Sequence, residues 1–164
     1  MGTPEKAKAI MQTLMPYITN LIGNEEHFKM IFSISSQYGE DDSENRLKDV
    51  TAKIQDVTNI ENVAVTVRRT ISSSETLIYA ALRQKDIFAK SPERRIPVID
   101  RVGSGDAFSA GLIYASIQNF SPQDSINFAS ASCAMKHTIT KDINFATVEE
   151  IKNLIKSDSS DVKR

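Results

Sequence analysis

Residues 98–111 combine a strand end, a glycine-containing turn and a helix start, and this combination limits the folds open to the chain. The apolar run at residues 96–99 is followed by Phe108 and Leu112 at helical spacing, so the hydrophobic period changes from strand to helix at Gly103 and Gly105. An abrupt strand-to-helix turn is typical of α/β folds in which helices cover a sheet.

The chemistry of this turn suits an anion. Gly103 and Gly105 allow positive φ and a close approach to the backbone, and the first N–H groups of the next helix have no intrahelical partner. A carboxylate at Asp106 can accept a proton from an attacking hydroxyl while those N–H groups stabilise a phosphoryl group. The alternative is that Asp106 only caps the helix and the glycines only form the turn. The segment is neither a P-loop nor a dinucleotide fingerprint, because no Gly-Lys-Ser/Thr follows and residue 108 is Phe.

The remaining pattern alternates helices and strands. Thr3, Ser43 and Ser121 are expected to cap helices, and Thr147 with Glu150 forms a capping box before the last one. Strands are expected at residues 17–22, 63–67 and 77–82, with helices after residue 105, over residues 122–137 and over residues 147–155.

Residues 100–106, Asp-Arg-Val-Gly-Ser-Gly-Asp, resemble the second signature of the ribokinase (PfkB) sugar kinases, usually Asp-Thr-x-Gly-Ala-Gly-Asp. Arg101 stands in place of the Thr and Ser104 in place of the Ala. The Arg variant is carried by the branch that phosphorylates 2-keto-3-deoxygluconate, and residues 21–26, 66–74 and 135–144 resemble further blocks of that branch. Four blocks in the same order make the resemblance specific.

The resemblance implies an α/β, ribokinase-like layered sheet with helices on both faces, of which this chain is the nucleotide-binding half. Family members are twice as long, and residues 2–7 resemble a stretch from the middle of the full enzyme. Residues 1–157 are therefore expected to form this carboxy-terminal half and residues 158–164 a polar, frayed tail. The family's amino-terminal half supplies most sugar contacts, so a partner half or a homo-oligomer is expected to cover the open sheet edges.

The resemblance also implies site residues. Asp106 is the catalytic base, Gly103, Ser104 and Gly105 line the anion hole, and Arg101 joins Asp106 at the substrate. The nucleotide is expected beside Arg68, Ser72, Ser74, Ser132, Met135 and His137. Alternatives stay open: a surface salt bridge for Arg68, a simple turn for the serines at 72 and 74, and a core or capping role for His137.

A magnesium environment is implied for Asn24 and, indirectly through water, for Glu26. The family motif is Asn-x-x-Glu, whereas here His27 occupies its last position, so Glu26 as a mere partner of the helix dipole is the alternative.

The reaction implied is transfer of the γ-phosphoryl group of ATP, with Mg²⁺, to the primary hydroxyl of 2-keto-3-deoxygluconate. The alternatives are another ribokinase-like acceptor such as fructose or ribose, or a truncated, non-catalytic nucleotide-binding or interaction module.

The resemblance implies ATP and a small sugar acid as partners, and composition is consistent with a cytoplasmic enzyme. The 164 residues include 20 basic and 21 acidic ones, so the net charge of −1 offers no basis for binding nucleic acid or an anionic membrane. Cys133 is the single cysteine, which excludes an internal disulfide and favours a reduced, buried thiol. The sequence shows neither a signal peptide nor an apolar stretch of membrane-spanning length.

Overall fold

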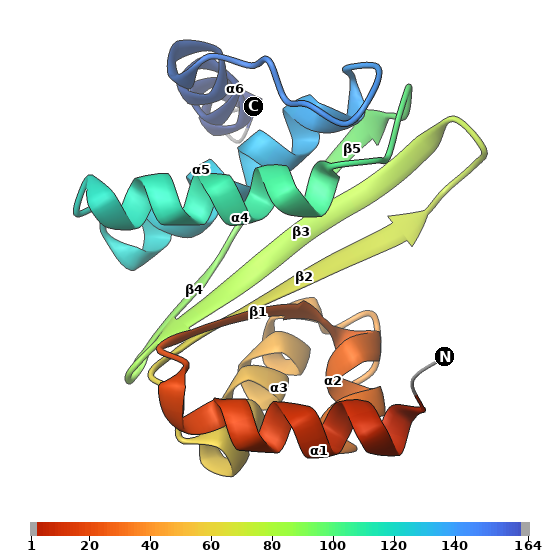
Figure 1. Ribbon diagram of the computed structural model, residues 1–164. Coiled ribbons are helices and arrows are strands. Elements are labelled where there is room, and N and C mark those ends of the chain that lie inside the picture. The colour runs from red at the N-terminus through yellow and green to blue at the C-terminus, as the bar shows by residue number, and fades with distance from the viewer. Residues whose placement is uncertain (1–2, 162–164) are drawn as a thin grey trace. The chain divides into compact units, whose positions relative to one another are not determined.

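The structure is a computed structural model that describes residues 3–161, with the backbone only for Pro4 and for residues 158–161. These residues form the mixed α/β fold that the sequence predicts (Figure 1). The helices are α1 (Pro4–Leu14), α2 (Glu25–Phe32), α3 (Ser43–Thr58), α4 (Ser104–Ile117), α5 (Pro122–His137) and α6 (Val148–Asp161), with a 3-10 turn, η1, at Met15–Tyr17. The strands are β1 (Asn20–Asn24), β2 (Asn62–Thr70), β3 (Glu75–Gln84), β4 (Ile87–Lys90) and β5 (Arg94–Pro97).

The strands join in one sheet with the order β1-β2-β3-β4, and β5 pairs with β3. Strand β1 runs parallel to β2, with Leu21 opposite Val63, and β5 runs antiparallel to β3, with Ile96 opposite Thr76. In β2 the consecutive residues Val63, Ala64 and Val65 are all buried. A strand that is covered on both faces requires a continuous apolar run. This run, rich in β-branched residues, is the signal that predicted the strand at residues 63–67.

The chain divides into two compact units, and the assignment of residues 1–157 to one carboxy-terminal half of a kinase domain stays a prediction. One unit comprises residues 1–67 and 81–89, and the other comprises residues 68–80 and 90–164. Helices α1–α3 belong to the first unit and α4–α6 to the second, while β2, β3 and β4 each pass from one unit to the other.

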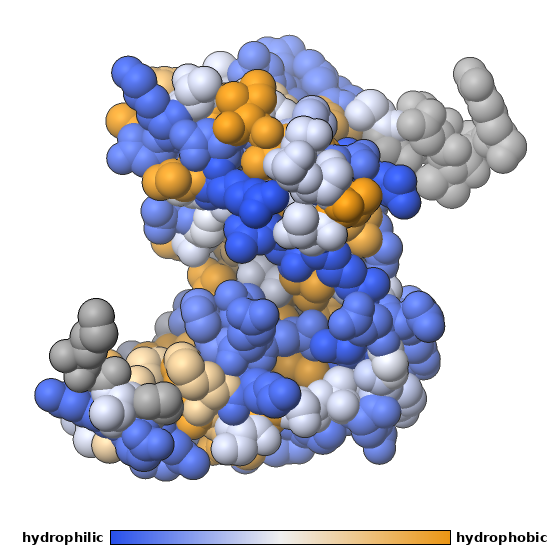
Figure 2. Space-filling view, turned by 90° about the vertical axis from the view of Figure 1, so that its right-hand side faces the viewer, coloured by the Kyte–Doolittle hydropathy of each residue, from blue (hydrophilic) through white to orange (hydrophobic). Residues whose placement is uncertain are grey.

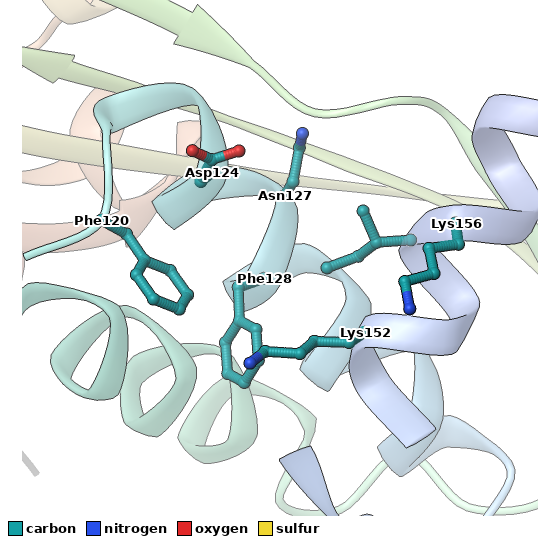
Figure 3. A pocket seen from close by; sticks show the side chains of 7 residues that line it. Phe120, Asp124, Asn127, Phe128, Lys152 and Lys156 are labelled. Atoms are coloured by element: carbon teal, nitrogen blue, oxygen red, sulfur yellow. The ribbon is translucent and has the colours of Figure 1, made fainter. Parts of the chain in front are cut away.

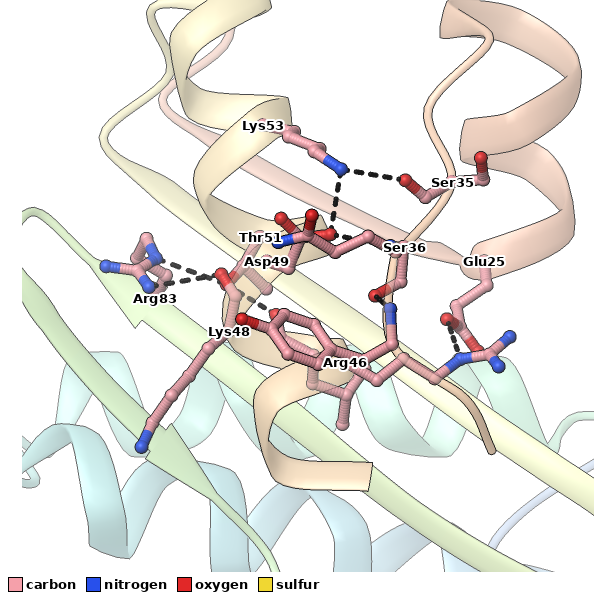
Figure 4. Close-up of polar contacts among 12 residues, drawn as sticks. Glu25, Ser35, Ser36, Arg46, Lys48, Asp49, Thr51, Lys53 and Arg83 are labelled. Carbon is pink, nitrogen blue, oxygen red and sulfur yellow. Dashed lines mark hydrogen bonds and ion pairs between the residues drawn. The ribbon is translucent and has the colours of Figure 1, made fainter. Parts of the chain in front are cut away.

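In the first unit α3 combines a buried stripe with a polar face. Leu47, Val50, Thr51 and Ile54 recur at helical spacing and are buried. On the polar side, Asp49 Oδ2 lies 2.8 Å from Lys53 Nζ and accepts a hydrogen bond of 3.1 Å from the Gln37 backbone (Figure 4). Burial raises the pKa of Asp49, but its hydrogen bonds to Lys53 and to the backbone of Gln37 outweigh it, so the pKa lies below its ordinary value. These contacts fix the loop before α3 to the helix.

In the second unit α5 is buried along most of its length. It packs closely on α4, where a Cβ at Gly111 would lie 2.9 Å from Ala129 Cα and 3.1 Å from Ser132 Cβ. Carbon atoms normally approach to about 3.5–4.0 Å, so only glycine allows the two helices to lie this close together. Phe128 and Ile151 add an apolar cluster between α5 and α6.

Several predicted caps are confirmed. The Thr3 and Ser121 side chains accept hydrogen bonds from the backbones of Lys6 and Asp124, at the starts of α1 and α5. Glu150 Oε2 accepts a hydrogen bond of 2.7 Å from the Thr147 backbone N–H, and Thr147 Oγ1 accepts one of 3.3 Å from the Glu150 backbone N–H, which is the predicted capping box.

Other predicted boundaries were wrong. The strand expected at residues 17–22 begins only at Asn20, because Pro16 holds the preceding residues in the 3-10 turn η1. Asp42, not Ser43, caps α3, since its Oδ1 accepts a hydrogen bond from the Asn45 backbone. Strand β4 was not predicted, and β5 begins at Arg94, earlier than the apolar run indicated. Helix α6 continues past residue 155 to Asp161, so its end was placed too early. Residues 162–164 lie outside the described residues, and the polar, frayed tail at 158–164 stays a prediction.

Candidate functional site

The glycine turn before α4 has the conformation that its first glycine requires. Gly103 has φ of 78° and precedes the helix directly. A Cβ at this position would meet the carbonyl oxygen of Asp142 and lie 2.9 Å from its carbonyl carbon. Gly103 is therefore needed both for the left-handed backbone and for this close approach. Gly105, by contrast, lies inside α4 without positive φ, so the conformational freedom expected for it was wrong.

Asp106 lies in the first turn of α4, is exposed, and has no ion pair or hydrogen-bonded partner for its carboxylate within residues 3–161. The N–H groups of Gly103, Gly105 and Asp106 likewise have no hydrogen-bond acceptor there. The Ser104 N–H, one of the expected donors, instead bonds to the Arg101 carbonyl at 3.3 Å. The Asp106 carboxylate and the neighbouring N–H groups thus form no hydrogen bonds within the described residues, which leaves them available to a ligand.

The loop after α5 is attached to this turn by Asp100. Its Oδ1 accepts a hydrogen bond of 3.0 Å from the Val102 backbone, and its Oδ2 accepts one of 2.9 Å from the Lys141 backbone. The hydrogen bond from Val102 is the main reason that the pKa of Asp100 is lowered, and the bond from Lys141 adds to it. Asp100 therefore holds two segments that are distant in the sequence next to Gly103.

Ser132 and Asn144 connect the same loop to α4 from the other side. Ser132 Oγ donates a hydrogen bond of 3.0 Å to the carbonyl of Ala107, the residue after Asp106. Asn144 Nδ2 donates to both the carbonyl and the hydroxyl oxygen of Ser132, at 3.2 Å each. The hydroxyl of Ser132 is thus buried and engaged within the protein, and its nucleotide contact stays a prediction. In the sequence, Asn144 stands out only as the last residue of segment 135–144, which resembles a block of the family. That resemblance is the one sequence signal for its contact with Ser132.

His137 lies buried at the end of α5. Its Nδ1 lies 2.8 Å from the Cys133 carbonyl oxygen, to which it donates, and its buried Nε2 has no partner among the described residues. Burial lowers the pKa of His137; the bond to Cys133 opposes this, while the positive charges of Arg68, Lys136 and Arg101 add to it. The His137 carbonyl also accepts hydrogen bonds from the backbones of residues 99 and 100. His137 is therefore buried with one ring nitrogen unpartnered among the described residues, and its nucleotide contact stays a prediction.

The other predicted nucleotide residues lie in varied surroundings. Arg68 is exposed near the end of β2, without an ion pair in the described part of the chain, and Arg101 is half-buried in the turn before α4. Ser72 and Ser74 form the exposed turn between β2 and β3, in which the Ser74 N–H donates to Ser72 Oγ at 3.3 Å. Met135 is half-buried against the cluster around Phe128. All of them belong to the second unit, like Asp106.

The predicted magnesium residues belong to the first unit. Asn24 ends β1 and caps α2, its Oδ1 accepting a hydrogen bond of 2.8 Å from the His27 backbone, while Glu25 forms an ion pair of 2.7 Å with Arg46. Glu26 is exposed in the first turn of α2. Within the described residues no three His, Cys, Asp or Glu side chains come together as metal ligands. These residues do not fit a magnesium ion held by protein ligands alone.

A pocket of about 260 Å³ opens between α5 and α6 (Figure 3). Phe120, Phe128 and Ile155 provide apolar walls, and Lys152 and Lys156 lie at its side on α6. None of the predicted site residues is among the described residues that line it. The pocket is therefore separate from the turn around Asp106.

Apolar side chains are also exposed on the two loops that Asp100 joins, namely Ile99, Val102, Ile143 and Phe145. Figure 2 shows one face of the molecule, on which apolar residues lie singly or in small groups between hydrophilic ones. In the part of the chain that the structure describes, no helix combines the length and apolar character of a membrane span.

A family model and solved structures both relate this chain to carbohydrate kinases. A family model described as pfkB family carbohydrate kinase matches residues 2–147. The crystal structure of the 2-dehydro-3-deoxygluconokinase of Thermotoga maritima superposes with a TM-score of 0.88 at 30% identity, over 94% of this chain and 46% of that one. A PfkB family carbohydrate kinase of Listeria grayi gives a TM-score of 0.81 at 28% identity, over 94% of this chain and 46% of that one.

The 5-dehydro-2-deoxygluconokinase of Clostridium beijerinckii is 33% identical over 69 residues, which are 40% of this chain and 20% of that protein. The chain thus spans about half the length of the two solved structures and a smaller part of the curated relative.

Proposed function

Because the chain belongs to the pfkB family of carbohydrate kinases, we propose that it is the nucleotide-binding part of an ATP-dependent sugar kinase. The observation that supports this best is the first turn of α4, where the exposed Asp106 carboxylate and the N–H groups of Gly103 and Gly105 remain unused by the fold. A helix start with free N–H groups attracts phosphate oxygens, and an adjacent free carboxylate can take a proton.

In the proposed reaction the acceptor hydroxyl attacks the γ-phosphorus of ATP and its proton passes to Asp106. The bond between the γ-phosphorus and the β,γ-bridging oxygen breaks, and ADP leaves. The N–H groups at the start of α4 stabilise the charge on the transferred phosphoryl group without moving during the reaction. Magnesium enters with ATP as part of the substrate. A positioned general base contributes about 10²–10⁴-fold to the rate.

The proposed acceptor is 2-keto-3-deoxygluconate, phosphorylated on its primary hydroxyl. Support comes from the Thermotoga maritima relative, whose name describes a 2-dehydro-3-deoxygluconokinase. The Clostridium beijerinckii relative is named for an isomeric sugar acid, 5-dehydro-2-deoxygluconate, which differs in the positions of the keto group and of the deoxy carbon, and this isomer is the nearest alternative acceptor. Fructose and ribose are the more distant alternatives. Arg101 is proposed to pair with the acceptor, since its guanidinium has no ion pair among the described residues.

The proposed nucleotide contacts are Arg68, Ser72 and Ser74 from the β2–β3 region, with Met135 and His137 from the end of α5. Arg68 is exposed and supplies a positive charge for a phosphate. Ser132 contributes indirectly, because its hydroxyl holds the Ala107 carbonyl behind Asp106.

Calorimetric titration of the chain with Mg·ATP tests the nucleotide part of the proposal. We expect saturable one-to-one binding, retained in Asp106→Asn and weakened in Arg68→Ala. Lys152→Ala, at the separate pocket, is the matched control for loss of an exposed cation. No binding by a folded wild-type chain would refute the proposal for this polypeptide.

The transfer step is tested by ADP release with each isomeric keto sugar acid, fructose and ribose. Turnover that Asp106→Asn lowers by about 10²-fold or more, without a change in nucleotide affinity, supports the general base. Near-normal turnover in that variant contradicts it.

A non-catalytic module is the second candidate, because the chain spans only 46% of the solved relatives. Mg·ATP binding without transfer to any acceptor in the panel, by a chain of defined oligomeric state, would favour this function.

A further inference from the structure

The pocket between α5 and α6 has no role in the proposed reaction. Both helices belong to the second unit, and none of the described residues that line the pocket belongs to the turn around Asp106. In Figure 3 the side chains of Lys152 and Lys156 come from α6, and those of Phe120 and Phe128 come from the opposite side. An apolar cavity with a few polar groups is typical of a site for a small molecule.

The apolar wall of the pocket is held in place by contacts within the protein. Phe128 is 3% exposed and clusters with Ile151 of α6. Its ring stacks on that of Tyr114, with 5.1 Å between the centroids, and meets the ring of Phe120 edge-on at 5.9 Å. Aromatic pairs at these separations stabilise one another, so the wall is formed before a ligand binds. A preformed wall lowers the entropic cost of binding an apolar group.

The other wall carries positive charge. Lys152 and Lys156 are four positions apart on α6, and Ile155 of the same helix also lines the pocket. Both lysines are exposed, and neither ammonium group has a hydrogen-bond acceptor or an ion-pair partner among the side chains that the structure describes. Two like charges four positions apart on a helix destabilise it. An anion between the two ammonium groups would relieve this repulsion.

Among the described lining residues Asp124 is the one acidic side chain. Its Oδ2 accepts a hydrogen bond of 2.6 Å from Ser121 Oγ at the start of α5. A single carboxylate balances only one of the two lysines, so the lining as a whole keeps a positive charge. The pocket therefore combines an aromatic wall with an unbalanced cation.

We propose that this pocket binds a small carboxylate with an apolar body. The body lies against Phe120, Phe128 and Ile155, and the carboxylate lies between Lys152 and Lys156. The volume of about 260 Å³ is below the range of about 300–1,000 Å³ typical of sites for drug-sized ligands, so the ligand is small. The proposal does not rest on the proposed function, because the two sites share no described residue.

Titration of the full chain, followed by the backbone amide shifts in nuclear magnetic resonance spectra, tests the proposal with three probes. The first is 3-phenylpropionate. The second, 3-phenylpropanamide, keeps the apolar body without the charge, and the third, acetate, keeps the charge without the body. We expect saturable binding of 3-phenylpropionate with the largest shifts at residues 120–128 and 152–156. The amide and acetate should each bind about tenfold or more weakly, because each lacks one of the two contacts.

A double variant, Lys152→Gln with Lys156→Gln, removes both charges and keeps residues of similar helix propensity. It should bind 3-phenylpropionate about tenfold more weakly than the wild type, because its glutamines cannot form charge-assisted hydrogen bonds. Lys29→Gln, which removes an exposed cation from α2 in the first unit, is the matched control and should bind like the wild type.

Four results would each overturn the proposal. These are the absence of saturable binding to the folded wild-type chain, equal affinity for the acid and its amide, wild-type affinity in the double variant, and shifts that are largest at residues 103–106. The comparison of the acid with its amide uses the wild-type chain alone, so it decides the matter even where the double variant does not fold.

Discussion

The two glycines of the turn before α4 should respond to alanine in opposite ways. At Gly103 alanine must adopt φ of 78°, which costs about 1–2 kcal/mol in an L-residue. Its Cβ would also meet the carbonyl group of Asp142, and overpacking of this kind costs about 1–3 kcal/mol. We expect Gly103→Ala to lower the free energy of unfolding by about 2–5 kcal/mol.

Gly105, two residues later in the same motif, offers a matched control. It lies inside α4 without positive φ, and a Cβ there meets nothing within 4 Å. Alanine restricts the unfolded chain, so Gly105→Ala should leave the protein as stable as the wild type or more stable, by up to about 1 kcal/mol. Because the position is exposed beside Asp106, the same methyl group should weaken Mg·ATP binding by obstructing the approach of a phosphate.

Urea unfolding followed by circular dichroism measures both changes. With a slope of about 2 kcal/mol/M, a loss of about 3 kcal/mol lowers the midpoint by about 1.5 M. Equal midpoints for the two variants would refute the assignment of the left-handed residue to Gly103. Wild-type Mg·ATP affinity in a stable Gly105→Ala variant would contradict the close approach of a phosphate to this turn.

Three further predictions concern the surroundings of the turn. Asn144→Ala removes two hydrogen bonds to Ser132 and should cost about 1–3 kcal/mol in urea unfolding, whereas Asn153→Ala on the exposed side of α6 should cost little. Burial lowers the pKa of His137 in the folded state, so as the pH falls the unfolded chain takes up the proton before the folded chain does. The free energy of unfolding should therefore decrease as the pH drops below about 6.5. His137→Asn should flatten this dependence, and an unchanged pH profile of unfolding in that variant would contradict the reasoning. Because the pKa of Cys133 is raised to about 12, iodoacetamide at mildly alkaline pH should leave this thiol unmodified in the folded protein and alkylate it only in urea. Rapid alkylation of the folded protein, measured by mass spectrometry, would contradict this prediction.

Much of the fold could be predicted because its signals are local. The caps of α1, α5 and α6 each depend on a side chain that reaches a backbone group three residues away, and Pro16 ends α1 within its own turn. Strand β4 was missed because its four residues are too few to show a hydrophobic period.

The sequence by itself determined the order of the helices and of every strand except β4. It also determined the glycine turn and the identity of Asp106 as the carboxylate at its end, since these depend on neighbours within a few positions. Only the tertiary structure decided which polar groups stay free. Ser132 and Ser72 were both expected to contact the nucleotide. The hydroxyl of Ser132, however, forms hydrogen bonds with Ala107 and Asn144, which belong to two other segments. Those partners meet through the packing of α4 on α5, which no local pattern records, because such contacts follow from burying apolar surface over the whole chain.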